Sequence, residues 1–346
     1  MKIDGFVYDA TLERIGAMAA DFEGAGYDGL FLGETAHDPF LPLGVAAGMT
    51  SHLTLGTGIA VAFPRSPMHL ANLGHDLQVA SGGRFVLGLG SQIRPHIEKR
   101  FSAVWTHPAA RMRELVEAIR AVWRCWNEGE PLSFRGDFYT LTLMTPFFVP
   151  APSPSGAPPI MIAAVGERMA EVAGEVADGV FVHAFTSERY LRERMLPALE
   201  RGLALGGRTR SSLSVCPQVF VAVGTTEREV EERREAVRGQ VAFYASTPAY
   251  RPVLEVHGWG ALQDELNALS KQGRWSDMAT LITDDVLDVF CVSGPPTQAG
   301  ADIVRRFGGL VDRVSFYTPG LVDPFRLALL IEAIREECGQ VAGPAA

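Results

Sequence analysis

The chain has 346 residues, of which 47% are hydrophobic and 21% are charged, an ordinary composition for a globular protein. Its 40 acidic and 31 basic side chains give a formal net charge of −9, which argues against a general nucleic-acid binder. The sequence shows no signal peptide and no apolar run of membrane-spanning length, and its four cysteines are widely spaced. We therefore expect a cytoplasmic protein with reduced thiols that acts on a small molecule, without metal, nucleic-acid or membrane partners.

Short apolar runs typical of buried parallel strands recur along the chain, and a helical pattern follows each of them. The expected strands are 3–7, 29–32, 53–59, 85–89, 160–163, 179–182, 215–223 and 314–317. The expected helices are 11–25, 40–49, 67–80, 111–127, 167–176, 187–205, 226–245 and 324–337. Eight strand-and-helix units predict an α/β fold of the TIM (β/α)8 barrel type. An open doubly wound sheet, which needs only six units, is the alternative.

Three segments, near residues 92–110, 131–159 and 248–309, interrupt this pattern. The second contains a predicted hairpin over 134–141, and the third carries helical patterns near 261–270 and over 284–292. Because insertions in a barrel usually lie over its catalytic face, we expect one domain over 1–346 whose insertions shape the substrate cavity. The apolar stretches 144–150 and 248–275 are the candidates for this role, and plain spacers are the alternative.

Several common catalytic motifs are missing. The Gly88-Leu-Gly90 run begins like a dinucleotide fingerprint but lacks the third glycine, and no acid follows near twenty residues on. The sequence contains no GxSxG, HExxH or GxxxxGK[ST] motif. It therefore gives no support to a Rossmann, hydrolase, zinc-protease or P-loop function.

The ends of the expected strands carry the candidate site residues, because a parallel barrel binds its ligands at that face. After the second strand come Glu34 and His37, which could donate a proton, although Asp38 could equally cap the next helix with His37 half exposed. The glycine pair Gly56 and Gly58 ends the third strand and would allow close approach of a ligand.

The next three strand ends extend this set. The fourth is followed by a polar and basic run from Gly90 to His96, which suits either a cofactor edge or a surface loop. The fifth runs through small residues into a helix N-terminus at Glu167, which predicts an anion site or simple helix packing. His183 follows the sixth strand and is either part of the same mouth or a buried core histidine.

Four stretches give the chain a family resemblance: LTLGTGI at 53–59, SGGRFVLGLGSQ at 81–92, PIMIAAVG at 159–166 and AGEVADG at 173–179. With these, the sequence resembles the luciferase-like monooxygenase superfamily and, within it, the F420-dependent oxidoreductases. The resemblance implies a TIM barrel that holds a tricyclic ring at its C-terminal mouth. It also implies a non-prolyl cis peptide between Gly58 and Ile59, whose bulge presses on one face of the ring.

The resemblance also implies which residues hold the cofactor. The bulge comprises Gly58, Ile59 and Ala60. The polar tail and phosphate are expected at Gly90, Ser91, Gln92, Ala164, Val165, Gly166 and Glu167.

His37 corresponds to an active-site histidine that many F420 enzymes place close to the hydride-carrying carbon. Those relatives often have the sequence Ser-Asp-His, whereas this chain has Thr35-Ala36-His37. The aspartate that would contact the cofactor ring is therefore missing here, and Glu34 could replace it. His37 is the first candidate for the catalytic proton, followed by His96 and Glu34. Arg94 and His183 are candidates for substrate binding, with a surface role for Arg94 as the alternative.

The resulting hypothesis is an oxidoreductase that transfers a hydride between coenzyme F420 and a small, hydrophobic organic substrate. The alternative is an FMN-dependent monooxygenase of the same fold that activates oxygen. A third possibility, from a different functional class, is a non-catalytic barrel that stores or senses the cofactor. Members of the family are usually dimers, so we expect a homodimer.

Overall fold

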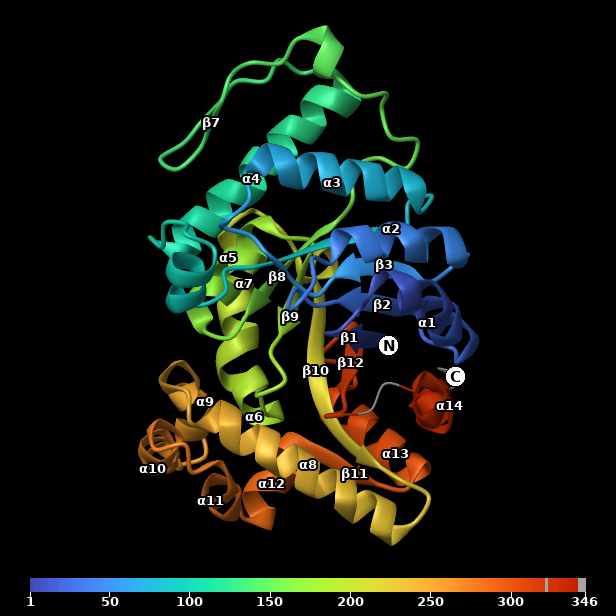
Figure 1. The fold of residues 1–346 in the computed structure, drawn as a ribbon, viewed down its shortest axis with the longest axis vertical. Coiled ribbons are helices and arrows are strands. Elements are labelled where there is room, and N and C mark those ends of the chain that lie inside the picture. Colours follow the sequence, from blue (N-terminus) through green and yellow to red (C-terminus); the bar gives the residue numbers. More distant parts are fainter. Residues whose placement is uncertain (321–322, 342–346) are drawn as a thin grey trace.

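The computed structural model describes residues 1–320 and 323–341 and contains a closed barrel of eight parallel strands (Figure 1). In order around the barrel these are β1 (Lys2–Val7), β2 (Gly29–Leu32), β3 (Thr54–Thr57), β5 (Phe85–Gly90), β8 (Ile160–Ala164), β9 (Gly179–Val182), β10 (Ser214–Val223) and β12 (Arg313–Tyr317). The last strand closes the ring on the first, with Ile3 opposite Val314. The predicted TIM barrel is confirmed, and the doubly wound alternative is wrong.

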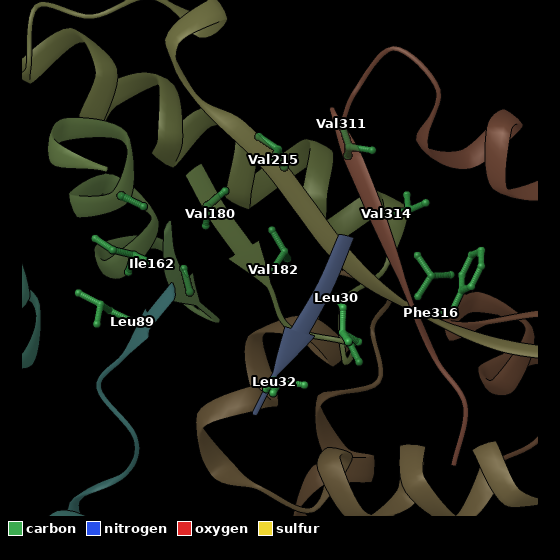
Figure 2. Close-up of a cluster of buried hydrophobic side chains, with 14 of the residues drawn as sticks. Leu30, Leu32, Leu89, Ile162, Val180, Val182, Val215, Val311, Val314 and Phe316 are labelled. Atoms are coloured by element: carbon green, nitrogen blue, oxygen red, sulfur yellow. The ribbon is translucent and has the colours of Figure 1, made fainter. Parts of the chain in front are cut away.

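Helices surround the barrel (Figure 1). They are α1 (Leu12–Gly24), α2 (Phe40–Met49), α3 (Pro67–Ala80), α4 (Pro108–Glu128), α5 (Glu167–Val176), α6 (Glu188–Tyr190), which continues through a π turn into α7 (Leu196–Leu205), α8 (Glu227–Ala245), α13 (Pro296–Phe307) and α14 (Ala328–Val341). Each strand points alternate side chains outward to these helices, as Leu30 and Leu32 of β2 or Val180 and Val182 of β9 illustrate (Figure 2). Because both faces of the sheet are buried, its strands appear in the sequence as continuous apolar runs.

The inward-pointing side chains fill the barrel in layers. Asp4 and Arg313 form a buried ion pair, with the Asp4 carboxylate 2.7 Å from Arg313 Nε. Next to them lies an apolar layer that includes the rings of Phe6, Phe31 and Phe181. These rings lie 5.0–5.6 Å apart between centroids, so the barrel is solid up to its C-terminal end.

The first insertion precedes α4 in the chain and the second follows it. Residues 92–110 contain the π turn His96–Arg100 and end in the first residues of α4. Residues 131–159 form the predicted hairpin, β6 (Phe134–Arg135) with β7 (Thr140–Leu141), and then a 3-10 turn, Pro146–Phe148. This arm projects beyond α3 and α4 (Figure 1), and Phe147 is 90% exposed. The expectation that 144–150 lines the substrate cavity is therefore wrong.

The third insertion is largely helical. It comprises a 3-10 turn (Pro248–Tyr250), α9 (Arg251–Glu255), α10 (Gly260–Lys271), α11 (Trp275–Thr280), α12 (Asp284–Phe290), strand β11 (Cys291–Gly294) and α13. The helix predicted over 284–292 ends at Phe290, because Cys291 begins a strand that pairs with the outer half of β10 at Phe220. Within 1–320 and 323–341, no helix has both the length and the apolar character needed to cross a bilayer.

Candidate functional site

A cavity of about 320 Å³ lies at the C-terminal mouth of the barrel, where ligands bind in this fold. One side of it, here called the small-residue wall, consists of Gly33, Gly58, Gly90, Ala163 and Ala164 from the ends of β2, β3, β5 and β8. The opposite side, here called the polar wall, consists of Tyr8, His183, Gln218, Tyr244 and Tyr250. The cavity therefore has small residues on one side and hydrogen-bonding side chains on the other.

In the small-residue wall the third strand of the barrel is interrupted: β3 ends at Thr57, and the short strand β4 (Ala60–Val61) follows after two residues. The peptide bond between Gly58 and Ile59 is cis, which confirms the expectation. The Ile59 side chain packs over Gly90, where a Cβ would lie 2.6 Å from Ile59 Cδ1. A larger residue at 90 would therefore displace Ile59 from the cavity edge.

Glu34 lies on the cavity wall but already has partners. Its Oε2 atom is 2.7 Å from Arg65 Nη1 and accepts a hydrogen bond of 2.7 Å from the Val61 backbone N–H. Arg65 also pairs with Asp38 at 2.6 Å. Glu34 thus fixes the chain where β4 begins, and its carboxylate is neutralised by the guanidinium.

His183 lies in the polar wall, packed between two tyrosines. Its ring stacks on Tyr250 with centroids 4.8 Å apart and meets the edge of Tyr244 at 4.6 Å. Nδ1 accepts a hydrogen bond from the Phe185 N–H at 3.1 Å, and Nε2 is 3.3 Å from the Tyr250 hydroxyl. Burial lowers the pKa of His183 from 6.5 to about 4, so this imidazole is neutral at physiological pH.

The tyrosine hydroxyls of this region are also neutral. Tyr8 Oη accepts a hydrogen bond of 2.7 Å from Gln218, and Tyr244 Oη donates one of 3.2 Å to Tyr317. Burial raises the pKa of Tyr8 and Tyr244 above the ordinary value, and that of Tyr250 to about 12. The polar wall therefore offers hydrogen bonds without net charge.

Nine of the residues proposed from the sequence line this cavity. They are Glu34, Gly58, Ile59, Gly90, Ser91, Gln92, Ala164, Val165 and His183. They come from the ends of five strands, β2, β3, β5, β8 and β9, because those ends meet at one face of the barrel.

Three of the proposed residues point elsewhere at the rim. His37 has about half of its side chain exposed, and its Nε2 is 3.7 Å from the Asp9 carboxylate. Arg94 is exposed and pairs with Glu98 at 2.9 Å. His96 is exposed at the start of the π turn.

Ala60, Gly166 and Glu167 do not line the cavity either. Ala60 is fully buried in β4, opposite Leu89. Gly166 is the residue before α5, and Glu167 pairs with arginines of the neighbouring helical segment on the outer surface. The backbone N–H groups at this helix end remain next to the cavity-lining Val165.

Among the polar cavity residues, the sequence analysis missed Tyr8, Gln218 and Tyr244, whereas Tyr250 lies in the stretch 248–275 that it expected to shape the cavity. Strand alternation could have identified the first two, because Tyr8 follows the inward-pointing Phe6 by two residues and Gln218 follows Cys216 in the same way. Tyr244 and Tyr250 come from the end of α8 and the turn after it, where strand alternation gives no signal.

Comparison with known proteins identifies the family of the chain. The family model described as luciferase-like monooxygenase matches residues 2–313. An uncharacterized protein of Mycobacterium tuberculosis is 53% identical over 314 residues, 91% of this chain and 92% of that protein. A 5,10-methylenetetrahydromethanopterin reductase of Archaeoglobus fulgidus is 30% identical over 274 residues, 78% of this chain and 76% of the reductase.

The fold is likewise shared with solved structures. The coenzyme F420 dependent tetrahydromethanopterin reductase from Methanopyrus kandleri superimposes with a TM-score of 0.81 at 22% identity, over 97% of this chain and 99% of that one. The same architecture therefore persists at low sequence identity.

Proposed function

Because the chain belongs to the luciferase-like monooxygenase family, we propose that it is an oxidoreductase that transfers a hydride between coenzyme F420 and a small organic substrate. The observation that carries the proposal is the cavity at the barrel mouth, with small residues on one side and uncharged hydrogen-bonding groups on the other. The reductase name of the 30% identical Archaeoglobus fulgidus relative supports this reaction class.

The residues present fit a flat heterocyclic ring with an anionic tail. The small-residue wall carries no side chain larger than a methyl group, and Ile59, which packs over Gly90, gives a ring an apolar surface to lie on. We assign the cofactor to Gly58, Ile59, Gly90, Ser91, Gln92, Ala164 and Val165, with Ala60 supporting the bulge from behind. Gly166 and Glu167 begin α5, whose free N–H groups and positive dipole end suit the anionic tail.

When bound, the deazaflavin would supply a hydride donor or acceptor that reacts slowly with oxygen. The chain then has to hold the substrate in contact with the ring and handle one proton. We assign the proton to His37, which lies at the rim of the cavity two residues after the cavity-lining Thr35. Glu34 is a weaker candidate because Arg65 neutralises it, and His96 is weaker because it lies exposed at the start of the π turn. Arg94, the candidate for substrate binding, is paired with Glu98.

The alternative is an FMN-dependent monooxygenase, which the description of the matching family favours. A titration of the purified apo protein with F420 and with FMN, followed by ligand fluorescence, separates the two. We expect saturable binding of F420 and much weaker binding of FMN. Tight binding of FMN alone would support the monooxygenase, and F420 binding without single turnover on a broad substrate panel would support a storage role.

Val165 gives this titration a matched pair of variants. Val165→Asp adds a negative charge beside the start of α5, whereas Val165→Asn adds similar volume without charge. If the anionic tail binds there, the Asp variant should weaken F420 binding at least tenfold more than the Asn variant. Equal effects of the two variants would place the tail elsewhere.

We also propose that the chain forms a homodimer through α2. The exposed face of this helix carries Leu41, Gly44, Val45, Gly48 and Met49, at spacings that form one apolar stripe, and the helix has no charged residue. A two-fold axis would place this uncharged stripe against its own copy, and the two glycines would let the helices approach closely.

A further inference from the structure

We propose that the polar wall selects an uncharged, planar substrate whose oxygen accepts a hydrogen bond from the Tyr250 hydroxyl, with His183 as the positioning residue for that hydroxyl. This inference rests on the proposed function, since it takes the cavity to be the place of the substrate. It specifies the chemical class of that substrate, which neither the fold nor the relatives define.

The first argument is the charge of the cavity. Among its described lining residues Glu34 is the only one with a formal charge, and Arg65 pairs with it at 2.7 Å. A bound anion would find no cation on the wall, and a bound cation would compete with Arg65 for Glu34. Burying an unpaired charge is strongly unfavourable, so the polar wall, away from the site assigned to the anionic tail, favours a neutral ligand.

The second argument is the direction of the hydrogen bonds. Nδ1 of His183 accepts from the Phe185 N–H, so the proton of the neutral ring is on Nε2. That Nε2–H then donates to the Tyr250 oxygen at 3.3 Å. Within the described residues the Tyr250 hydroxyl has no further hydrogen bond, and its own proton can therefore be donated to a ligand.

Tyr8 is a weaker candidate for this donor. Its oxygen also accepts a hydrogen bond, from Gln218, but its side chain is 38% exposed and water competes for its proton. Tyr250 is instead partly buried and held in place by its stack on His183.

The third argument is shape. The rings of His183, Tyr244 and Tyr250 pack within 6.0 Å of one another, and Phe6 and Phe181 form the floor. Aromatic faces and edges favour a planar, apolar body between them. The ligand class that satisfies all three arguments is an aromatic or conjugated ketone or the corresponding alcohol.

Four probes of nearly the same shape test this by isothermal titration of the apo protein. Acetophenone is neutral and has an acceptor oxygen, α-methylstyrene replaces that oxygen by CH2, and benzoate and benzamidine carry opposite charges. We expect acetophenone to bind at least tenfold more tightly than either charged probe. Equal or tighter binding of benzoate or benzamidine would overturn the proposal.

Variants then identify the donor. Tyr250→Phe should reduce acetophenone affinity about fivefold to tenfold, to the level of α-methylstyrene, whose own binding should not change. His183→Gln retains an N–H near the position of Nε2 and should preserve most of the affinity, whereas His183→Phe should lose it. Tyr139→Phe, on the hairpin away from the cavity, is the control. Unchanged discrimination between the two neutral probes in Tyr250→Phe would remove Tyr250 from this role.

Binding of F420 is measured separately on the same variants, because the two proposals can fail independently. If the protein binds acetophenone selectively but does not bind F420, the proposed ligand class stands and the hydride-transfer function is rejected. If the protein binds F420 but does not discriminate among the four probes, the proposed function stands and the ligand class is rejected.

Discussion

Asp4 and Arg313 join the first and last strands of the barrel through two hydrogen bonds, of 2.7 Å from Nε and 2.5 Å from Nη2. Both side chains are buried, and Gly29 of β2 faces them so closely that a Cβ there would lie 2.5 Å from Asp4 Oδ1. Burial raises the pKa of Asp4, an effect that the guanidinium opposes. The pair therefore closes the barrel at the end opposite the cavity.

Removing one partner of this pair should be costly. Asp4→Asn or Arg313→Met leaves a buried group without its partner and should lower the free energy of unfolding by about 3–5 kcal/mol. The double variant Asp4→Leu/Arg313→Met removes both charges and should lose far less than the sum, as urea titration would show. Arg228→Ala breaks the exposed pair with Glu232 on α8 and should leave stability nearly unchanged. If the double variant lost as much unfolding free energy as the two single variants together, Asp4 and Arg313 would not be energetically coupled.

A second prediction concerns the projecting hairpin. The Glu114 carboxylate of α4 accepts hydrogen bonds from three consecutive backbone N–H groups, those of Asp137, Phe138 and Tyr139, at 2.9, 2.7 and 2.6 Å. Glu114→Gln weakens these charge-assisted bonds and should speed hydrogen exchange of the three amides about tenfold or more. Glu117→Gln, on the exposed face of the same helix, is the control. Unchanged exchange would mean that packing alone holds the hairpin.

Most of the fold could be predicted from the sequence, because strands buried on both faces appear as apolar runs and each is followed by a periodic helix. The helix expected over 40–49 has those bounds in the structure. Strand β11 (Cys291–Gly294) was missed because its apolar residues continue the periodicity of α12, and only its pairing with β10 distinguishes them.

The site could be predicted less completely. Small residues at strand ends are visible in the sequence, and the cis Gly58–Ile59 bond followed from the family resemblance. Arg94 and Glu98 have the i, i+4 spacing of a helical turn, but a polar run of this kind also fits an irregular loop, and only the structure shows that the turn forms and pairs them. Tyr250 belongs to the stretch 248–275 that was expected to shape the cavity, but the sequence could not identify this residue within the stretch, because the turn of the chain after α8 is a tertiary effect without local signal.

The third prediction follows from the pKa of His183, which is about 4 in the folded chain and 6.5 ordinarily. Between these values the unfolded chain binds a proton that the folded chain does not, so stability is lost as the pH falls from 6.5 to 4. Relative to His183→Gln, the wild type should lose about 3 kcal/mol more between pH 7 and 4, measured by urea unfolding. His96→Gln, at an exposed site, should behave like the wild type. Parallel curves for the wild type and His183→Gln would contradict the assignment.

The fourth prediction tests the proposed dimer. Val45→Glu places a charge in the apolar stripe of α2 and should convert a dimer into a monomer in light scattering coupled to gel filtration. Leu205→Glu changes an exposed apolar residue at the end of α7, on another side of the barrel (Figure 1), and should remain dimeric. Circular dichroism checks that both variants are folded. A monomeric wild type, or a dimeric Val45→Glu protein, would rule out this interface.

The fifth prediction separates the two histidines near the cavity. His37 is exposed beside Asp9, whereas His183 is buried and neutral in the polar wall. If His37 moves the catalytic proton, His37→Ala should lower turnover by about 10²-fold or more. The Kd for F420 should change less than threefold, because His37 lies at the rim and is not one of the residues assigned to the cofactor. His52→Ala, an exposed histidine before β3, is the control. Normal turnover in His37→Ala would remove that role from His37 and leave Tyr250 as the proton-bearing group nearest the substrate.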